Sequence, residues 1–223
     1  MKAVAIDGPA GAGKSTISRK VAQEIGFVYV DTGALYRTVG LYVIGKGADT
    51  KSADEVVPLL SEISVEMKFV NKVQKIFLNG EDVSDKIRLP EISMAASDVS
   101  AIPAVREFLF DMQRSIALKE NVVMDGRDIG SVVLPNADVK IFLTASPEDR
   151  ARRRYEELLS KGVEVDYDTV LEDVKQRDYN DSHRKIAPLC VAEGAVVIDT
   201  TGNELEKSVS IMVDTVKKLL NIK

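Results

Sequence analysis

The feature that most constrains this chain is a glycine-rich turn close to its N-terminus. The turn follows the G-x-x-x-x-G-K-[ST] pattern and consists of Gly8, Pro9, Ala10, Gly11, Ala12, Gly13, Lys14 and Ser15, with Thr16 directly after it. The apolar run 3–6 precedes the turn, and Ile17, Val21 and Ile25 follow it at helical spacing. In such a strand–turn–helix unit successive N–H groups point into one concavity, and the helix adds the positive end of its dipole. We therefore predict a site for the phosphates of a nucleoside triphosphate.

Two side chains of the turn have specific expected roles. Lys14 is expected to reach the β- and γ-phosphates, and the Ser15 hydroxyl is expected to ligate Mg²⁺. A dinucleotide-binding turn fits less well, because the last glycine of G-x-G-x-x-G would fall on Thr16. The remaining alternative is a tight turn without a ligand, which the flanking strand and helix patterns disfavour.

Composition narrows the class of protein. The 223 residues carry a formal net charge of -5, which argues against a broad nucleic-acid-binding surface. A single cysteine, Cys190, and a single histidine, His183, argue against zinc sites and Cys/His nucleophile pairs. Residues 1–6 run into the first strand with no room for a leader, and no apolar run approaches the ~18 residues of a membrane-spanning helix. We expect a cytoplasmic protein without nucleic-acid or membrane partners.

Five apolar runs without polar alternation are typical of strands buried in a parallel sheet. They are residues 3–6, 27–30, 121–124, 139–143 and 195–198. Aspartates follow four of these runs, namely Asp7, Asp31, Asp125 and Asp199. Helical patterns separate the runs, and an amphipathic stripe over 205–220 ends the chain. These patterns predict an α/β fold with its ligands at the carboxyl ends of the strands.

Residues 64–83 differ from these apolar runs, because apolar and polar residues alternate in them as they do in antiparallel strands. Turn residues lie at 70–72 and 79–82, and a helix is predicted over 103–118, where Pro103 suits the first turn. We interpret residues 62–100 as a small antiparallel insert within a single domain that spans residues 1–223.

Several nucleotide-binding classes lack support in the sequence. A GTPase needs an Asn-Lys-x-Asp motif, and the stretch Asn71–Gln74 has no aspartate at its end. The Asp-x-x-Gly of Asp199–Gly202 follows the last strand, which is the wrong order for a switch. A motor ATPase usually has a larger core and arginines that bridge subunits. Instead, arginines from several segments are available here to surround a second, smaller anion.

One such segment, DTGALYR, follows the second predicted strand. Thr32 is expected to cap the helix that begins there, and Arg37 lies about one turn inside that helix. Arg37 is then either a ligand of the anion or a solvated side chain.

A second segment, DGRD, follows the third predicted strand. Asp125 is placed to hold Mg²⁺ through water, and Arg127 and Asp128 are placed to meet the acceptor. The alternative is a turn that is held by aspartate hydrogen bonds.

Two further clusters lie on predicted helices. Arg150, Arg153 and Arg154 share one helical face, whereas Arg152 points elsewhere. In RDYNDSHR, the residues Arg177, Asp181 and Arg184 follow at i, i+4 and i+7 and present cation, anion, cation. Each cluster is either part of an anion site or a solvated surface network.

Taken together, the clusters favour phosphoryl transfer between two nucleotides. This reaction gathers many negative charges in one pocket, and it depends on positioning, charge neutralisation and the exclusion of water. Mobile segments that carry arginines meet that need. We expect a lid region over 150–184, with its tip at 160–167.

The motifs GPAGAGKST, DTGALYR, DGRDIGSVVLPNADVKIFL and RDYNDSHRKIAPL together resemble the bacterial cytidylate kinases, a family of P-loop nucleoside-monophosphate kinases. The similarity runs over nearly the whole chain. It implies the P-loop kinase three-layer fold, with a five-stranded parallel sheet and a small antiparallel β insert. It also implies transfer of the ATP γ-phosphoryl group to CMP or dCMP with Mg²⁺, in a monomer.

The resemblance also implies roles for individual residues. Ser97 and Arg106 would read the cytosine edge, and the loop 200–203 would lie near the donor base. The acceptor site would comprise Thr32, Arg37, Ser97, Arg106, Arg127, Asp128, Arg177, Asp181 and Arg184. The residues acting on the transferring group would be Lys14, Arg127, Asp128, Arg153 and Arg154. Two rivals remain, a kinase for a small hydroxyl-bearing metabolite with Asp128 as its base, and a nucleotide-binding regulatory protein without turnover.

Overall fold

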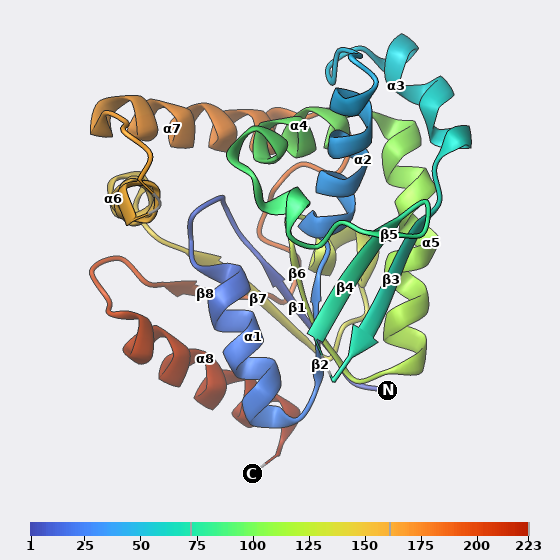
Figure 1. Ribbon diagram of the computed structural model, residues 1–223. Helices are drawn as coiled ribbons and strands as arrows, with labels where there is room; N and C mark the ends of the chain where they lie inside the picture. The colour runs from blue at the N-terminus through green and yellow to red at the C-terminus, as the bar shows by residue number, and fades with distance from the viewer. Residues whose placement is uncertain (72, 161, 223) are drawn as a thin grey trace.

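A parallel sheet forms the centre of the molecule (Figure 1). The computed structural model describes residues 1–71, 73–160 and 162–222. The strands are β1 (Ala3–Asp7), β2 (Val28–Asp31), β6 (Val122–Gly126), β7 (Val139–Thr144) and β8 (Val196–Asp199). They pair in parallel in the order β2-β6-β1-β7-β8, so all five predicted strands are confirmed. Their carboxyl ends therefore lie at one edge of the sheet.

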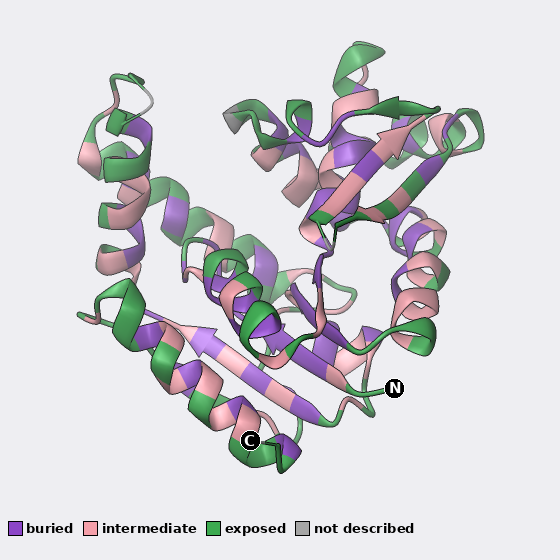
Figure 2. Ribbon diagram, turned by 60° about the horizontal axis from the view of Figure 1, so that its bottom comes forward, coloured by how far each residue is buried: buried purple, intermediate pink, exposed green. Residues whose placement is uncertain are grey.

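Helices cover both faces of this sheet. On one face α1 (Lys14–Ile25) and α8 (Leu205–Leu220) pack through Ile17, Val21 and Met212 against the strands. On the other face lies α5 (Pro103–Lys119), together with a short π-helical segment at 129–133. Figure 2 shows the central strands buried and the outer helices striped, which is the pattern of a three-layer α/β fold. The predicted fold class is confirmed.

A second, antiparallel sheet lies beside the parallel one. It consists of β3 (Val65–Val70), β4 (Val73–Leu78) and β5 (Glu81–Asp82), in that order. Asn79 and Gly80 adopt φ values of 50° and 85° in the turn before β5, as the Asn-Gly pair predicts. The predicted turn at 70–72 includes Lys72, which lies outside the described residues.

Helical segments flank this second sheet. They are α2 (Gly33–Gly45), α3 (Ala53–Leu59), a 3₁₀ turn at 60–62, another at 86–88 and α4 (Pro90–Ser100). Ile76 of β4 packs with Leu35 and Val39 of α2 in one apolar cluster. Neither α3 nor α4 was predicted from the sequence pattern.

A pair of helices, α6 (Pro147–Ser160) and α7 (Tyr167–His183), projects beside the carboxyl edge of the sheet. The two helices pack through a small cluster of their own that contains Ala151, Leu158 and Val174. The predicted lid tip at 160–167 connects them and includes Lys161, which lies outside the described residues. Within the described ranges, no helix combines the length and the apolar character needed to cross a membrane.

Candidate active site

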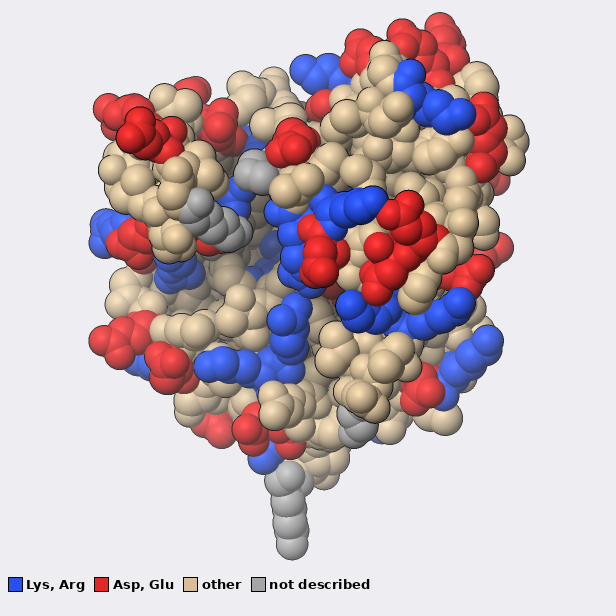
Figure 3. All heavy atoms as spheres, viewed as in Figure 1, with Lys and Arg blue, Asp and Glu red and all other residues tan. Residues whose placement is uncertain are grey.

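A cavity of about 770 Å³ opens at the carboxyl edge of the parallel sheet. Figure 3 shows Lys and Arg side chains gathered around a hollow in the middle of this face. Most of the residues selected from the sequence line it, namely Ala10, Gly11, Gly13, Lys14, Ser15, Thr16, Thr32, Arg37, Ser97, Arg106, Asp125, Arg127, Asp128, Arg153, Arg154, Arg177, Asp181 and Arg184. Segments that are distant in the sequence therefore meet in one space.

The glycine-rich turn forms the floor of the cavity. Gly8 has a φ of 151°, and a Cβ at this position would clash with the carbonyl oxygen of Leu143. Gly13 precedes α1 with a φ of 82°, in the left-handed region that favours glycine. Gly8, Pro9 and Ala12 are not among the cavity-lining residues, so their contribution is to the shape of the turn.

Lys14 is buried in the turn. Its Nζ donates a hydrogen bond of 2.7 Å to the carbonyl oxygen of Pro9. Burial, followed by the charge of Arg127, lowers the pKa of Lys14 to about 7. A polyanion in the cavity would favour the charged ammonium, so this site gains positive charge when such a ligand binds.

Asp125 lies near the carboxyl end of β6, beside the glycine-rich turn. Its carboxylate accepts hydrogen bonds from Ser15 Oγ at 2.9 Å and from Tyr29 Oη at 3.1 Å. Burial, followed by the charge of Asp31, raises the pKa of Asp125 to about 6.

The Ser15–Asp125 pair fits an ion that takes few ligands from the protein. A buried carboxylate beside a hydroxyl offers oxygen donors, which Mg²⁺ prefers, and Mg²⁺ commonly takes its other ligands from phosphates and water. The described part of the chain holds no cluster of three or more His, Cys, Asp or Glu side chains suited to a metal. The donor set therefore suits Mg²⁺ bound together with a nucleotide rather than a cage made only of protein ligands.

The helix α2 is not capped in the way the sequence predicts. The Thr32 hydroxyl donates instead to the carbonyl oxygen of Asp125, at 2.8 Å. The carboxylate of Asp31 accepts from the Ala34 N–H at 3.1 Å and pairs with Arg37 at 2.6 Å. Thr32 is therefore the N-cap residue, as predicted, but its side chain makes no capping hydrogen bond. Asp31 binds the N–H of Ala34 instead, and the Thr32 hydroxyl connects the start of α2 to β6.

The residues after β6 form a network of charges. Arg127 Nε donates to Asp181 on α7 at 2.7 Å, and Arg184 lies 3.4 Å from Asp128. Arg106 on α5 pairs with the other oxygen of Asp128. Burial raises the pKa of Asp128, whereas Arg127 holds the pKa of Asp181 below its usual value against the effect of burial. This part of the cavity wall therefore carries more arginines than carboxylates, and ion pairs hold both carboxylates in place.

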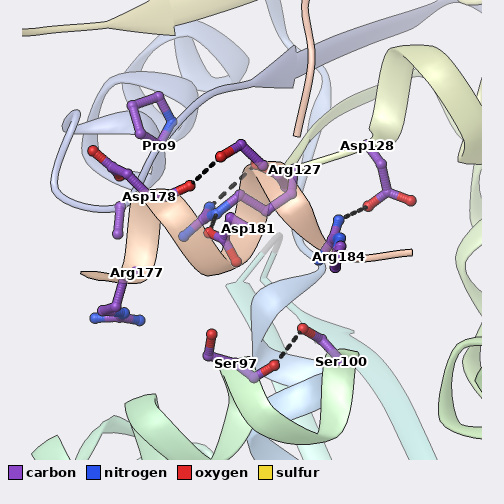
Figure 4. Close-up of polar contacts among 12 residues, drawn as sticks. Pro9, Ser97, Ser100, Arg127, Asp128, Arg177, Asp178, Asp181 and Arg184 are labelled. Carbon is purple, nitrogen blue, oxygen red and sulfur yellow. Dashed lines mark hydrogen bonds and ion pairs between the residues drawn. The ribbon is translucent and has the colours of Figure 1, made fainter. Parts of the chain in front are cut away.

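Figure 4 shows how α7 and α4 face this network. Arg177 on α7 donates to the carbonyl oxygen of Ser93 on α4 at 3.3 Å. Ser97 of α4 faces the arginines from the opposite wall. The predicted stripe over Arg177, Asp181 and Arg184 needs one correction, because α7 ends at His183 and Arg184 already has extended backbone.

The arginine run on α6 divides into separate roles. Arg153 donates to the carbonyl oxygen of Thr200 at 2.9 Å, and Arg154 lies 3.0 Å from Glu157. Both line the cavity. Arg150 is only 2% exposed and points instead toward the glycine-rich turn, where it donates to Ala10 O at 2.9 Å. The shared face expected from helical spacing is therefore only partly realised.

Further polar residues line the cavity without having been selected from the sequence. Among them are Tyr36, Arg88, Ser93, Ser100, Glu157 and Ser208. Tyr36 stands next to a selected residue within the DTGALYR motif, and Arg106 lies 5.6 Å above its ring. Arg88, Ser93 and Ser100 carry no local signal, because their position depends on how the second sheet and α4 pack.

Comparison with known proteins gives a consistent result. Residues 4–218 match the cytidylate kinase family. The cytidylate kinase of Caldicellulosiruptor bescii is 52% identical over 92% of this chain and 90% of that protein. The cytidylate kinase of Caldanaerobacter subterraneus subsp. tengcongensis is 51% identical over 96% of this chain and 94% of that protein. A solved structure of an uncharacterised protein from Eubacterium ventriosum matches with a TM-score of 0.54 at 13% identity, over 97% of this chain and 98% of that one, which shows the fold alone.

Proposed function

The chain belongs to the cytidylate kinase family, and from that premise we propose that it transfers the γ-phosphoryl group of ATP to CMP and dCMP. The observation that carries this proposal is that the glycine-rich turn, Arg127 after β6 and the arginines of α6 and α7 meet in one cavity. A cavity of about 770 Å³ has room for two nucleotides placed end to end.

The donor half of the proposed site is the turn and the residues around it. Its N–H groups and the start of α1 would hold the phosphates of ATP, and Lys14 would neutralise the β- and γ-phosphates. Asn203, in the loop after β8, lines the same cavity and would lie near the donor base. This half is common to many phosphoryl-transfer enzymes and does not set the acceptor.

The acceptor half is the opposite wall of the cavity. Arg37, Arg127, Arg177 and Arg184 would bind the phosphate of CMP, with Asp181 placed for the sugar. Ser97 and Arg106 would meet the cytosine edge, and the ion pair with Asp128 holds the Arg106 guanidinium in place.

Phosphoryl transfer needs little from the protein beyond position and charge. An oxygen of the CMP phosphate attacks the γ-phosphorus, its new P–O bond forms, and the bond to the β-phosphate oxygen breaks to release ADP. Lys14, Arg153 and Arg154 would offset the charge of the transferring group. Mg²⁺ held at Ser15 and Asp125 would supply further positive charge to the triphosphate.

The rest of the predicted organisation stays part of this proposal. Residues 62–100 would form the insert that carries part of the acceptor wall, and residues 150–184 would form a lid that excludes water. We expect a monomer that works in the cytoplasm, where ATP is supplied, with nucleotides as its partners.

The proposal is tested by release of ADP from ATP and Mg²⁺ in the presence of single acceptors. We expect ADP to form with CMP and dCMP, and more slowly or not at all with AMP, UMP or shikimate-like alcohols. ADP formation with an alcohol and none with CMP would favour a metabolite kinase. No acceptor-dependent ADP at all would favour a regulatory protein that only binds nucleotides.

Replacing Arg177 by alanine tests the acceptor wall. We expect the efficiency with CMP to fall by about tenfold to a hundredfold, because a charge-assisted contact to phosphate is lost, while ATP binding remains close to wild type. Calorimetric titration of ATP and initial rates over a range of CMP concentrations check this. Arg114, which lies on α5 and donates to the carbonyl oxygens of Val132 and Val133, is a matched arginine outside the cavity. Equal losses for ATP and CMP in Arg177→Ala would remove Arg177 from the acceptor site.

A further inference from the structure

One side chain of the second sheet is bonded to the edge of the parallel sheet. Gln74 of β4 accepts a hydrogen bond of 2.7 Å from the N–H of Asp31, and its amide nitrogen donates one of 3.0 Å to the carbonyl oxygen of the same residue. Because Asp31 offers one donor and one acceptor, these two groups identify the oxygen and the nitrogen of the Gln74 amide. Gln74 therefore pairs with the main chain of Asp31 much as a neighbouring strand would.

This pairing occurs where the parallel sheet has an open edge. β2 is an edge strand, and the N–H groups of Val28 and Thr32 bond inward to Asn121 and Asp125. Because successive residues of a strand face opposite sides, the main-chain groups of Asp31 point outward. Polar main-chain groups at a buried or half-buried strand edge require hydrogen-bond partners, and Gln74 supplies them for the N–H and C=O of Asp31.

Asp31, whose main chain binds Gln74, also pairs through its side chain with a cation of the cavity. The carboxylate of Asp31 pairs with Arg37 at 2.6 Å and is only 11% exposed. Among the described residues, Arg37 Nε is buried without a hydrogen-bond partner. The position of the Arg37 guanidinium thus depends strongly on Asp31, and a shift of the β2 end would carry Arg37 with it.

Apolar contacts join the second sheet to the rest of the protein elsewhere, through Ile76 of β4 and through Met67 and Phe69 of β3. A second cavity of about 490 Å³ lies behind Gln74, between the second sheet and the elements α1 and β2. Arg19 and Phe27 line it from the core, Ile76 lines it from β4, and Arg88 lines it from the 3₁₀ turn at 86–88. Beside this cavity, the two hydrogen bonds of Gln74 are what join β4 to the main chain of Asp31 at the end of β2.

We infer that Gln74 is a positioning residue for the acceptor: it fixes the end of β2 and, through Asp31, sets the place of Arg37. This inference rests on the proposed function, since it takes CMP as the ligand of Arg37. Gln74 lies outside the cavity that holds the acceptor wall, so its effect is transmitted by the main chain and not by contact.

Gln74→Met tests the inference, because methionine keeps the volume and removes both hydrogen bonds. We expect KM for CMP to rise about fivefold to tenfold, the size of one or two lost hydrogen bonds, with KM for ATP and kcat unchanged. Lys75→Met is the matched control: it is the next residue of β4, and it pairs with Asp82 rather than with the core. Gln74→Asn keeps the amide but shortens its reach, and it replaces Gln74→Met in the test should that variant not fold.

A double-mutant cycle decides whether the effect passes through Arg37. In an Arg37→Ala background we expect Gln74→Met to have no further effect on KM for CMP. The same fold-change in both backgrounds, a parallel rise of KM for ATP, or no change in KM for CMP would each overturn the inference. Absence of CMP turnover in the unmodified enzyme would instead refute the proposed function.

Discussion

Lys14→Ala is expected to lower kcat for ADP formation about a thousandfold, because it removes the positive charge that Lys14 carries when a triphosphate is bound. Lys14 is 6% exposed, and its Nζ already lies over the turn, against the carbonyl oxygen of Pro9. Initial rates with saturating ATP and CMP measure the effect. Lys20→Ala, on the same helix and with a side chain that is 44% exposed, is the control and should keep full activity. Near-normal turnover in Lys14→Ala would show that the turn does not act on the donor.

The charge of Lys14 also predicts a proton uptake. Its pKa of about 7 means that most molecules hold a neutral amine at pH 8, whereas a bound triphosphate raises this pKa and favours the ammonium. ATP binding at pH 8 should therefore take up close to one proton, and the uptake should vanish as the pH falls below 7. Calorimetry in two buffers of different ionisation enthalpy measures it. Uptake of the same size in Lys14→Ala would assign the proton to another group.

The core of the fold follows from local sequence patterns. Each apolar run is long enough for one strand, and a run without polar alternation is stable only where helices cover both faces. The motif around Lys14 identifies the strand before it as the first strand of the sheet, and it places the ligand site at the carboxyl end of that strand. The Asn79-Gly80 pair predicts a hairpin turn because Asn and Gly readily adopt the left-handed φ that this turn requires. Both residues have such a φ in the structure.

The side-chain pairs of the site could not be predicted in this way. Arg106 and Asp128 meet from α5 and the end of β6, and Arg127 meets Asp181 across 54 residues of chain. Sequence spacing describes neighbours on one helix or strand, whereas these pairs depend on how separate elements pack. Thr32 illustrates the same limit: it occupies the N-cap position, as its type predicts, but the side chain that accepts from the Ala34 N–H is that of Asp31.

Arg150 is the most consequential residue that helical spacing misplaced. Its guanidinium donates to the carbonyl oxygens of Ala10 and Ala145, and it pairs with Asp178 on α7 through both terminal nitrogens. One buried cation therefore connects the glycine-rich turn, the end of β7 and α7. A run of arginines gives no sign of this, because burial is decided by the turn and by α7 rather than by α6.

Arg150→Ala is expected to lower the free energy of unfolding by ~3 kcal/mol, since it leaves Asp178 and two carbonyl oxygens without their partner. The loss is large against the ~5–15 kcal/mol by which a domain is usually stable. KM for ATP should rise as well, because Ala10 is no longer held. Urea unfolding followed by circular dichroism measures the first effect. Arg152→Ala removes the same side chain from the same helix at a position 63% exposed and should change stability by less than about 0.5 kcal/mol. Equal losses in the two variants would mean that Arg150 contributes helix propensity and not the connection between the turn and α7.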